Sequence, residues 1–518
     1  MNGVVEAPMA GGMRKVLLAV GAYVAVLTAA ALWRWHVWTY GADTGLFAQA
    51  IADTVGGFRD GPEVGSHFRF HWAPLLGTLW PLVVVARSGL VLQVAQAVLI
   101  GASAIPFYAL ARTYLERRAA FAATALLLLY PPLLAVAFTE FHEIAFYPFV
   151  SFALFWAADR ARWRAFALLA LASALVREEA CIVFAIVGLT FAAIGFARTN
   201  RDARAGETAG LLTGAPLEPA RLAAAGLGLV ALNVAALVFY YGVVTPRLGG
   251  WEPAGEFYTY PFASGPVAVV IALVTHPANI VALLTFGRLT YLMEAFLPLA
   301  LLPFFSRWSL LALPGLAVVL LSSNAITWRM GSHYAAIFIP WLFIGLVSAL
   351  ARWQREGFAR RVRIWPRVAG AICAIVLIAF NPLHPAHYVR ASYPIGSDVR
   401  NALATIPPNA RVALHDEWFT HIAVGHPFAT VFFCPYVDYL VYADDYPNGY
   451  FQSQIVPELR AELASGQVRE RHRFGKVAVY TRTPDAGARY GRCLTARPDG
   501  FKTLRAFLDY DLSRERRP

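Results

Sequence analysis

The sequence predicts an α-helical polytopic membrane protein with about eleven transmembrane helices, followed by a C-terminal extracytoplasmic α/β domain. Three observations predict this class. The 518 residues are 58% hydrophobic and only 15% charged, whereas a soluble protein has about 25% charged residues. The apolar residues form blocks of about 20 residues, the length that crosses a bilayer core. The basic residues fall between these blocks rather than in a nucleic-acid-binding motif, so we expect no nucleic-acid partner.

Eleven apolar segments are the candidate transmembrane helices. The first is longer than the core of a cleaved signal peptide, and the bulky WRWHVW after it is a poor cleavage site, so we expect this segment to be retained. The segments are approximately 16–33, 89–111, 119–138, 144–158, 165–177, 180–196, 222–244, 289–305, 308–323, 334–350 and 368–382.

Alternate loops between these segments differ in their content of Lys and Arg. One set holds nineteen basic residues and the opposite set holds eight, although the loops of the second set are longer in total. Loops rich in Lys and Arg face the cytoplasm. We therefore expect a multi-pass protein of the bacterial inner (plasma) membrane with a cytoplasmic N-terminus and with Asp43, just after the first segment, on the outer side.

The tail changes in character, and the chain divides into a transmembrane domain (1–382) and an outer α/β domain (383–518). In the tail, NALATIPPNARVALHDEWFTHIAVGHP reads as helix, turn, strand and helix, and ATVFFCP, VDYLVYADD and KVAVYTRT read as strands. VPELRAELASG reads as a helix that ends at Gly466. A disulfide between Cys434 and Cys493 is permitted on the oxidising side, but the sequence does not decide whether it forms.

Ionisable residues gather in the outer loops. The first outer loop, 34–88, contains apolar residues at helical spacing after Asp43, which suggests a helix that lies in the membrane interface. The next outer loops are short, and charged groups near membrane depth are candidates for a functional site. The candidate residues are Asp43, His67, His71, Glu140, His142, Glu143, Arg177, Glu178, Glu179, Arg329 and His333.

Each candidate also has a purely structural interpretation. Asp43 suits the N-cap of the helix that follows it. Arg177 with Glu178 and Glu179 suits an internal salt bridge between two helices, and the histidines and Arg329 suit ordinary loop or interfacial positions. The functional hypothesis rests on the arrival of all these groups on one side of the membrane.

Several motifs together resemble a known family. These are DTGLFAQ, FRFHWAP, QVAQAVLIGASAIPFYALA, LYPPL, FHEIAFYP and LVREEA. They resemble a family of predicted prokaryotic membrane proteins described as a domain of unknown function, over roughly residues 15–480, and that family is similar to the GT-C superfamily of membrane glycosyltransferases. The resemblance implies a large first outer loop, an outer C-terminal domain and a polyprenyl-phosphate sugar donor.

The resemblance also implies roles for individual residues. Asp43 matches the acidic residue after the first helix that recurs as the catalytic position of GT-C enzymes. Glu140 and His142 lie where an acidic motif helps to bind a divalent metal in the oligosaccharyltransferase branch, so Asp43, Glu140 and His142 form the implied metal set. A strict Asp-x-Asp is absent here, and many members that use lipid-monophosphate sugars need no metal, so a metal cofactor stays open.

The sequence therefore predicts a glycosyltransferase that moves a sugar from a polyprenyl-phosphate donor to an envelope acceptor on the extracytoplasmic face. Asp43 is the expected base, because a carboxylate within hydrogen-bond reach can take the proton of an acceptor hydroxyl. Arg177 is the expected partner of the leaving phosphate, and Glu140, His142 and Glu143 with Glu178 and Glu179 form a second acidic cluster. His67, His71, Arg329 and His333 are expected to contact phosphate or sugar. The alternatives are a transporter or flippase for a lipid-linked or anionic substrate, and an assembly protein in which the tail does the work.

Overall fold

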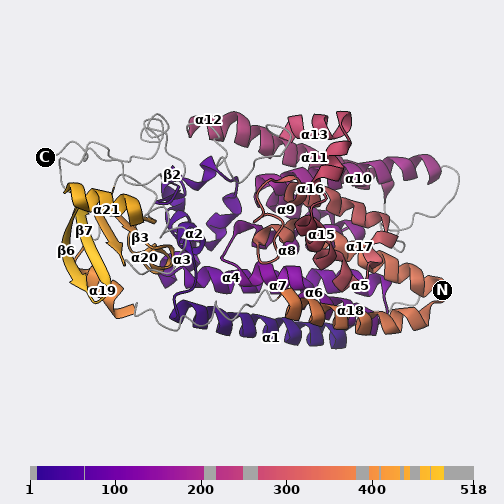
Figure 1. Cartoon of the computed structure of the whole chain (residues 1–518). Coiled ribbons are helices and arrows are strands. Elements are labelled where there is room, and N and C mark those ends of the chain that lie inside the picture. Colours follow the sequence, from indigo (N-terminus) through magenta and orange to yellow (C-terminus); the bar gives the residue numbers. More distant parts are fainter. Residues whose placement is uncertain are drawn as a thin grey trace.

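The computed structural model describes residues 9–63, 65–202, 218–248, 266–380, 396–407, 410–431, 437–443, 456–466 and 468–482. Cys434 and Cys493 lie outside these residues. The described part is a helical bundle with a small sheet at one end (Figure 1). Prolines and long apolar stretches determine where the bundle helices begin, break and end. The first outer loop and the C-terminal tail pack against each other.

The bundle contains long and short apolar helices. The predicted segments correspond to α1 (Met9–His36), α4 (Leu90–Ala102), α5 (Ala104–Tyr114), α6 (Arg117–Leu128), α7 (Pro131–Phe138), α8 (Tyr147–Asp159), α9 (Trp163–Ser173), α10 (Glu178–Asp202), α11 (Pro219–Phe239), α15 (Phe286–Phe296), α16 (Leu313–Leu321), α17 (Ile339–Arg355) and α18 (Ala359–Phe380). Two further apolar helices, α13 (Pro266–Thr275) and α14 (Ala278–Leu283), were not predicted.

The number of spans differs from the expected eleven. Among the described residues, five helices are long and apolar enough to cross a membrane, or six if the pair α6 and α7, bent by 44°, is one span. Prolines explain part of the difference, because Pro131 and Pro132 begin α7 at the bend, and Pro298 and Pro303 lie in short 3₁₀ turns after α15. The helical bundle is confirmed, and the count of eleven stays a prediction.

The basic loops meet at one end of the bundle. Gly12 near the start of α1 lies against Tyr108 of α5 and Arg117 of α6. Tyr114 at the end of α5 donates a hydrogen bond to Asp159 at the end of α8. The loops between these helices carry the arginines that the sequence assigned to the cytoplasm, and they therefore share one end. The orientation in the membrane stays a prediction.

The first outer loop is compactly folded. It contains α2 (Ala42–Ala52), a short hairpin of β1 (Arg59–Asp60) and β2 (Gly65–Ser66), and α3 (Trp80–Ala86). The expected interfacial helix is α2, but every residue from Thr44 to Ile51 is buried. The interfacial assignment is therefore wrong, because the helix lies between the bundle and the C-terminal domain instead of on a lipid surface.

The tail forms the predicted α/β unit. It contains α19 (Gly396–Ala404), β3 (Val412–Leu414), α20 (Asp416–Ile422), β4 (Ala429–Val431), β5 (Tyr439–Tyr442), α21 (Val456–Ser465), β6 (Val468–Phe474) and β7 (Val477–Arg482). The strand order is β4-β3-β5-β7-β6, with β3 parallel to β4 and β5 and the other pairs antiparallel. Gly466 has φ +75°, as expected of a glycine just after a helix. The boundary at residue 383 stays a prediction.

The tail docks on the outer loop through α20. A Cβ at Gly45 of α2 would lie 2.7–2.8 Å from Phe419 and Thr420, so α20 packs directly on the backbone of α2. The ring of His421 stacks on Trp38 at 3.8 Å and lies 4.1 Å from Trp35 at the end of α1. These contacts hold the second half of α20 against the start of α2 and the end of α1.

Candidate active-site pocket

A cavity of about 660 Å³ lies where the outer loops meet. Its walls come from the start of α2, the first outer loop, the turn after α7, the residue before α10, the segment 326–334 and the tail. Nine of the predicted site residues line it: Asp43, His67, His71, Glu140, His142, Glu143, Arg177, Arg329 and His333. Glu178 and Glu179 do not line the cavity, but both contact Arg177, which does. The structure thus brings together groups that are up to 290 residues apart in sequence.

Asp43 is presented to the cavity by the start of α2. The helix begins at Ala42 and its N-cap is Gly41, so Asp43 is not the N-cap. The cap is supplied from outside the helix, because Glu140 accepts hydrogen bonds from the backbone N–H of Gly41 at 2.9 Å and of Thr44 at 3.2 Å. The side chain of Asp43 is 54% exposed, and a carboxylate in a first helical turn is stabilised by the helix dipole.

His142 pairs with Asp43. Its Nε2 lies 3.2 Å from Oδ2 of Asp43, and its Nδ1 lies 2.9 Å from the carbonyl oxygen of Glu140. Because both ring nitrogens face acceptors, the doubly protonated ring fits this position best. Burial opposes the charge, but the hydrogen bond to Asp43 and the negative charge of that carboxylate raise the pKa of His142. The second oxygen of Asp43 stays available to the cavity.

Arg177 is surrounded by carboxylates. Its Nη1 lies 2.8 Å from Glu143, and its Nε donates to Glu179 at 2.7 Å. Its Nη2 lies 3.3 Å from Nε2 of His71, whose Nδ1 is 2.7 Å from Glu178. Arg177 is only 3% exposed. The predicted salt bridge of Arg177 with Glu178 and Glu179 therefore exists, and it extends to Glu143.

We call Arg177, His71, Glu143, Glu178 and Glu179 the arginine cage. These charges shift the pKa values of its members. Burial would raise the pKa of Glu143, but the positive charge of Arg177 lowers it to about 2. Burial and the same positive charge lower the pKa of His71 to about 3. A neutral His71 fits the geometry, since its Nε2 accepts from Arg177 while Nδ1–H donates to Glu178. Around Arg177 the cavity wall holds a fixed cation and fixed anions that are matched to one another.

The other predicted residues take different positions. His67 lies at the base of the β1–β2 hairpin, with Nδ1 at 2.9 Å from Glu63. His333 stacks on His142 with ring centroids 3.4 Å apart, and burial lowers its pKa well below the ordinary value. Arg329 is exposed on the cavity wall and has no ion-pair partner among the described residues. Arg329 therefore differs from Arg177, whose guanidinium is already paired with carboxylates.

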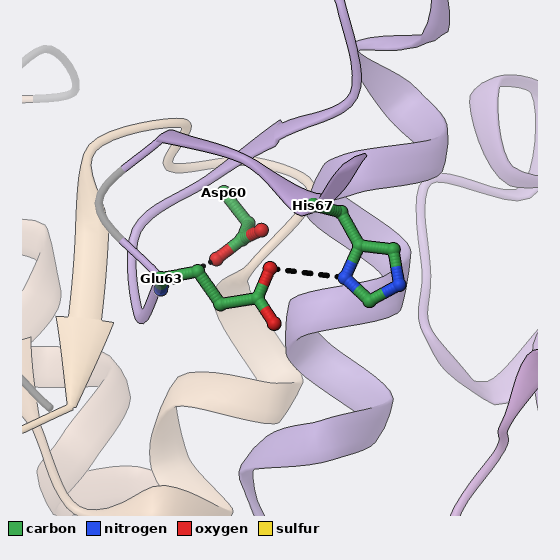
Figure 2. Close-up of side chains that lie close together, drawn as sticks. All are labelled: Asp60, Glu63 and His67. Atoms are coloured by element: carbon green, nitrogen blue, oxygen red, sulfur yellow. Dashed lines mark hydrogen bonds and ion pairs between the residues drawn. The ribbon is translucent and has the colours of Figure 1, made fainter. Parts of the chain in front are cut away.

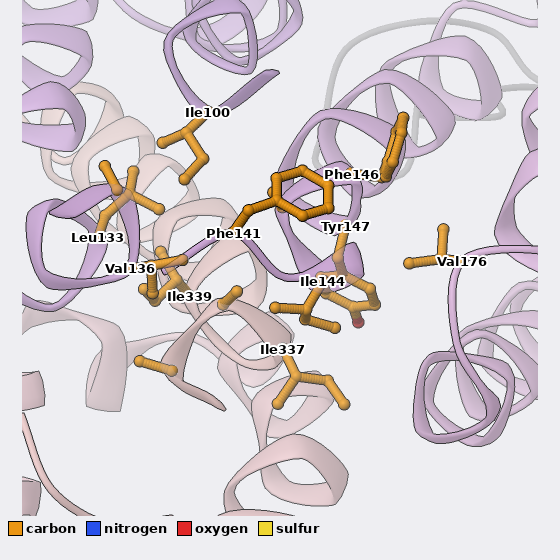
Figure 3. Close-up of a cluster of buried hydrophobic side chains, with 14 of the residues drawn as sticks. Ile100, Leu133, Val136, Phe141, Ile144, Phe146, Tyr147, Val176, Ile337 and Ile339 are labelled. Atoms are coloured by element: carbon orange, nitrogen blue, oxygen red, sulfur yellow. The ribbon is translucent and has the colours of Figure 1, made fainter. Parts of the chain in front are cut away.

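An apolar core holds the acidic turn in place. Phe141 points into a cluster with Ile100 and Ile144 (Figure 3). Its neighbours Glu140 and His142 line the cavity. Gln96 of α4 donates to the carbonyl oxygens of Val136, Thr139 and Glu140, and accepts from the N–H of His142 at 3.1 Å. Buried contacts therefore fix the geometry of the turn, whereas its charged side chains line the cavity.

Two acidic residues of the pocket were missed by sequence reasoning. Asp416 lines the cavity from the first turn of α20, and Glu63 lines it from the hairpin. Asp416 lies two residues after the end of β3, a parallel strand, and the carboxyl ends of parallel strands commonly border ligand sites. That position was a usable signal. Burial, with the charges of Glu417 and Asp43, raises the pKa of Asp416 to about 7.

The residues that suit a metal ion differ from the implied set. Among the described residues, two groups of three place ligand atoms within 4.8 Å of one another: Asp60, Glu63 and His67, and His71, Glu178 and Glu179. The implied set of Asp43, Glu140 and His142 is not one of these groups. Both carboxylate oxygens of Glu140 already accept backbone hydrogen bonds from α2, so Glu140 serves the helix.

Comparison with known proteins identifies the family. The fold and pocket define a helical membrane protein with several apolar helices and a cavity lined by charged residues. Residues 34–433 match the family described as "Predicted membrane protein (DUF2079)", and the chain belongs to this family. No curated protein matches the chain.

Several solved structures are similar to the chain. An Archaeoglobus fulgidus oligosaccharyltransferase tethered with an acceptor peptide has 15% identity and a TM-score of 0.40, over 86% of this chain and 71% of that chain. Its complex with Zn and sulfate has 17% identity and a TM-score of 0.40, over 83% and 69%. The archaeal oligosaccharyltransferase AglB from the same organism, with an inhibitory peptide and a dolichol-phosphate, has 14% identity and a TM-score of 0.40, over 83% and 70%.

Proposed function

We propose that this protein is a membrane glycosyltransferase that moves a sugar from a polyprenyl-phosphate donor to an acceptor on the outer face of the membrane. The observation that carries the proposal is the shared pocket of Asp43, the acidic turn at 140–143 and Arg177 with Arg329. The sequence resemblance to GT-C glycosyltransferases points to the same reaction class. The donor, acceptor and outward orientation are parts of this proposal.

Asp43 is proposed as the general base. Its side chain is half exposed to the cavity, and His142 orients one of its oxygens. The other oxygen would accept the proton of an acceptor hydroxyl as that hydroxyl attacks the anomeric carbon. A well-placed general base contributes about 10²–10⁴-fold in rate. Glu140 supports this step indirectly, because it fixes the helix start that carries Asp43.

Arg329 is proposed to meet the phosphate. As the bond between sugar and phosphate breaks, negative charge develops on the leaving phosphate, and a positioned cation stabilises that charge. Arg177 was the expected partner, but its guanidinium is occupied by Glu143, Glu179 and His71. Arg177 therefore has a structural role, in which it holds Glu143, Glu179 and His71 together. Arg329 is the exposed cation that would contact the donor phosphate.

The proposal is tested with membranes that carry the protein and a radiolabelled pool of polyprenyl-phosphate sugars. Wild type, Asp43→Asn and Arg329→Ala are compared for label that leaves the lipid, with Asp53→Asn as the control, because Asp53 pairs with Arg59 outside the cavity. We expect Asp43→Asn to lose at least 100-fold and the control to match wild type. Label that changes sidedness while it stays on the lipid would instead support the flippase.

A further inference from the structure

The β1–β2 hairpin brings together, at the edge of the cavity, three side chains of the types that ligate metal ions. Asp60 ends β1, Glu63 lies in the connecting turn, and His67 follows β2. Figure 2 shows the two carboxylates and the imidazole turned toward one another. Their ligand atoms lie within 4.8 Å of one another. Ligands of one ion at bond lengths of about 2.1 Å lie within roughly 4.2 Å of each other, so small side-chain movements would complete coordination.

A buried carboxylate oxygen points into this cluster without a partner. Asp60 is only 3% exposed. Its Oδ1 accepts a hydrogen bond from the N–H of Glu63 at 2.7 Å, but its Oδ2 has no hydrogen-bond partner among the described residues. In Figure 2 the carboxylate of Asp60 faces Glu63 and His67. A buried, unsatisfied carboxylate oxygen is costly, and a cation held by the three side chains would satisfy it.

The charge balance of the cavity also calls for a cation. Five carboxylates line it, from Asp43, Glu63, Glu140, Glu143 and Asp416, and the lining arginines are Arg177 and Arg329. Arg177 is already matched by Glu143 and Glu179. With His142 counted as a third cation, acidic side chains still outnumber basic ones on the wall that an anionic phosphate would enter. A metal cation there would reduce the repulsion, which is strong at short range in a low-dielectric site.

Two other acidic groups near the cavity already have partners. The group of His71, Glu178 and Glu179 contains the Arg177 guanidinium, which lies 2.7 Å from Glu179 and 3.3 Å from His71. Glu140 is bound to the backbone of α2. The hairpin group differs from these two, because it combines an unsatisfied buried carboxylate oxygen with two further ligand atoms within 4.8 Å.

We propose that Asp60, Glu63 and His67 bind one divalent cation of the Mn²⁺ or Zn²⁺ class. Two carboxylates and one imidazole form a mixed oxygen and nitrogen ligand set that suits these ions. Because Glu63 and His67 also line the cavity, the ion would border the ligand space. Its use as the partner of the donor phosphate rests on the proposed function, whereas its binding does not.

Metal binding is tested on the purified full-length protein, stripped with a chelator and titrated with Mn²⁺ while free Mn²⁺ is followed by electron paramagnetic resonance. Wild type is expected to bind one equivalent. Asp60→Asn and Glu63→Gln are expected to weaken binding more than tenfold, and His67→Phe to remove the nitrogen modulation from the spectrum of bound Mn²⁺. Asp53→Asn is the matched control, since Asp53 is an acidic residue of the same loop that pairs with Arg59.

The outcomes separate this proposal from the proposed function. Thermal unfolding of each variant without metal shows whether it is folded, and Glu63, which is only partly buried, provides the variant with the smaller packing change. No binding by wild type, or equal binding by wild type and all three variants, overturns the metal site even if sugar transfer is observed. Binding that depends on these residues, without any sugar transfer, keeps the metal site and overturns the proposed function.

Discussion

The carboxylate of Glu140 accepts a hydrogen bond at 2.9 Å from the backbone N–H of Gly41, which lies 99 residues earlier in the sequence. This contact ties the acidic turn after α7 to the helix start that presents Asp43. It depends on the absence of a side chain at Gly41, because a Cβ there would lie 2.4 Å from Oε1 of Glu140. Catalytic geometry at Asp43 is therefore expected to depend on both residues.

Gly41→Ala tests this dependence. The added methyl group would displace Glu140 from the start of α2, and loss of a helix cap costs about 1–2 kcal/mol. We expect a lower melting temperature and at least tenfold slower sugar transfer. Gly21→Ala in α1 is the matched control, since nothing lies within 4 Å of a Cβ at Gly21. Equal behaviour of the two variants would contradict the role given to Glu140.

Arg177→Ala is expected to destabilise the protein strongly. The substitution leaves the buried Glu143 and the partly buried Glu179 without their cation. Removal of one partner of a buried ion pair costs about 3–5 kcal/mol. The double variant Arg177→Met with Glu143→Gln is expected to recover part of this loss, because one uncompensated charge is removed as well. Thermal unfolding of both variants measures the effect. A double variant less stable than Arg177→Ala would contradict the claim that Arg177 compensates the charge of Glu143 in the arginine cage.

Arg329→Ala is expected to act differently from Arg177→Ala. Arg329 is exposed and has no ion-pair partner among the described residues, so its removal is expected to leave the melting temperature within about 1 °C, since surface changes stay within about 0.5 kcal/mol. Sugar transfer is expected to fall at least tenfold, because a charge-assisted contact with the phosphate is lost. Unchanged transfer would remove Arg329 from the phosphate site.

Asp416→Asn is expected to stabilise the protein more at high pH than at low pH. Burial, Glu417 and Asp43 raise the pKa of Asp416 from 3.8 to about 7. The folded protein therefore holds this proton more tightly than the unfolded chain, so ionisation of Asp416 reduces stability as the pH rises from about 4 to 7. We expect the variant to melt about 2–4 °C higher than wild type at pH 8, with a smaller gain at pH 5. An equal gain at both pH values would contradict the assignment.

His421→Ala is expected to loosen the C-terminal domain. The ring of His421 lies against Trp35 and Trp38, and these contacts help to hold α20 beside α2. Limited trypsin digestion is expected to release the C-terminal domain several-fold faster from this variant. His472→Ala on the exposed strand β6 is the control. Equal release from both variants would show that the docking depends on other contacts.

The sequence was most informative where a local pattern decides the structure. Apolar periodicity and turn residues predicted the bundle and the tail elements α19, β3, α20, β4, β5, α21 and β7. Positive-inside counting grouped Asp43, Glu140 and Arg177 on one side, and the structure places all three at one cavity. Strand β6 was missed, because its run of VRERHRF has mostly exposed charged side chains and lacks an apolar pattern.

The remaining features depend on contacts between distant segments. The start of α2 is capped by Glu140, which no pattern around Asp43 reveals. Asp416 reaches the cavity only because α20 packs against Gly45. The cluster of Asp60, Glu63 and His67 forms only when the hairpin closes. The number of membrane spans could not be predicted from the sequence either. Prolines break several apolar segments, and short buried helices such as α8 take the place of uniform spans.

The central claim is that this pocket breaks the bond between sugar and lipid phosphate. The most direct measurement is mass spectrometry of lipids from the purified protein in nanodiscs, supplied with a polyprenyl-phosphate sugar and an envelope extract as acceptor. The account predicts one free polyprenyl phosphate for each sugar transferred by wild type, and at least 100-fold less from Asp43→Asn. An intact donor in both samples, or equal release from wild type and Asp43→Asn, would contradict it.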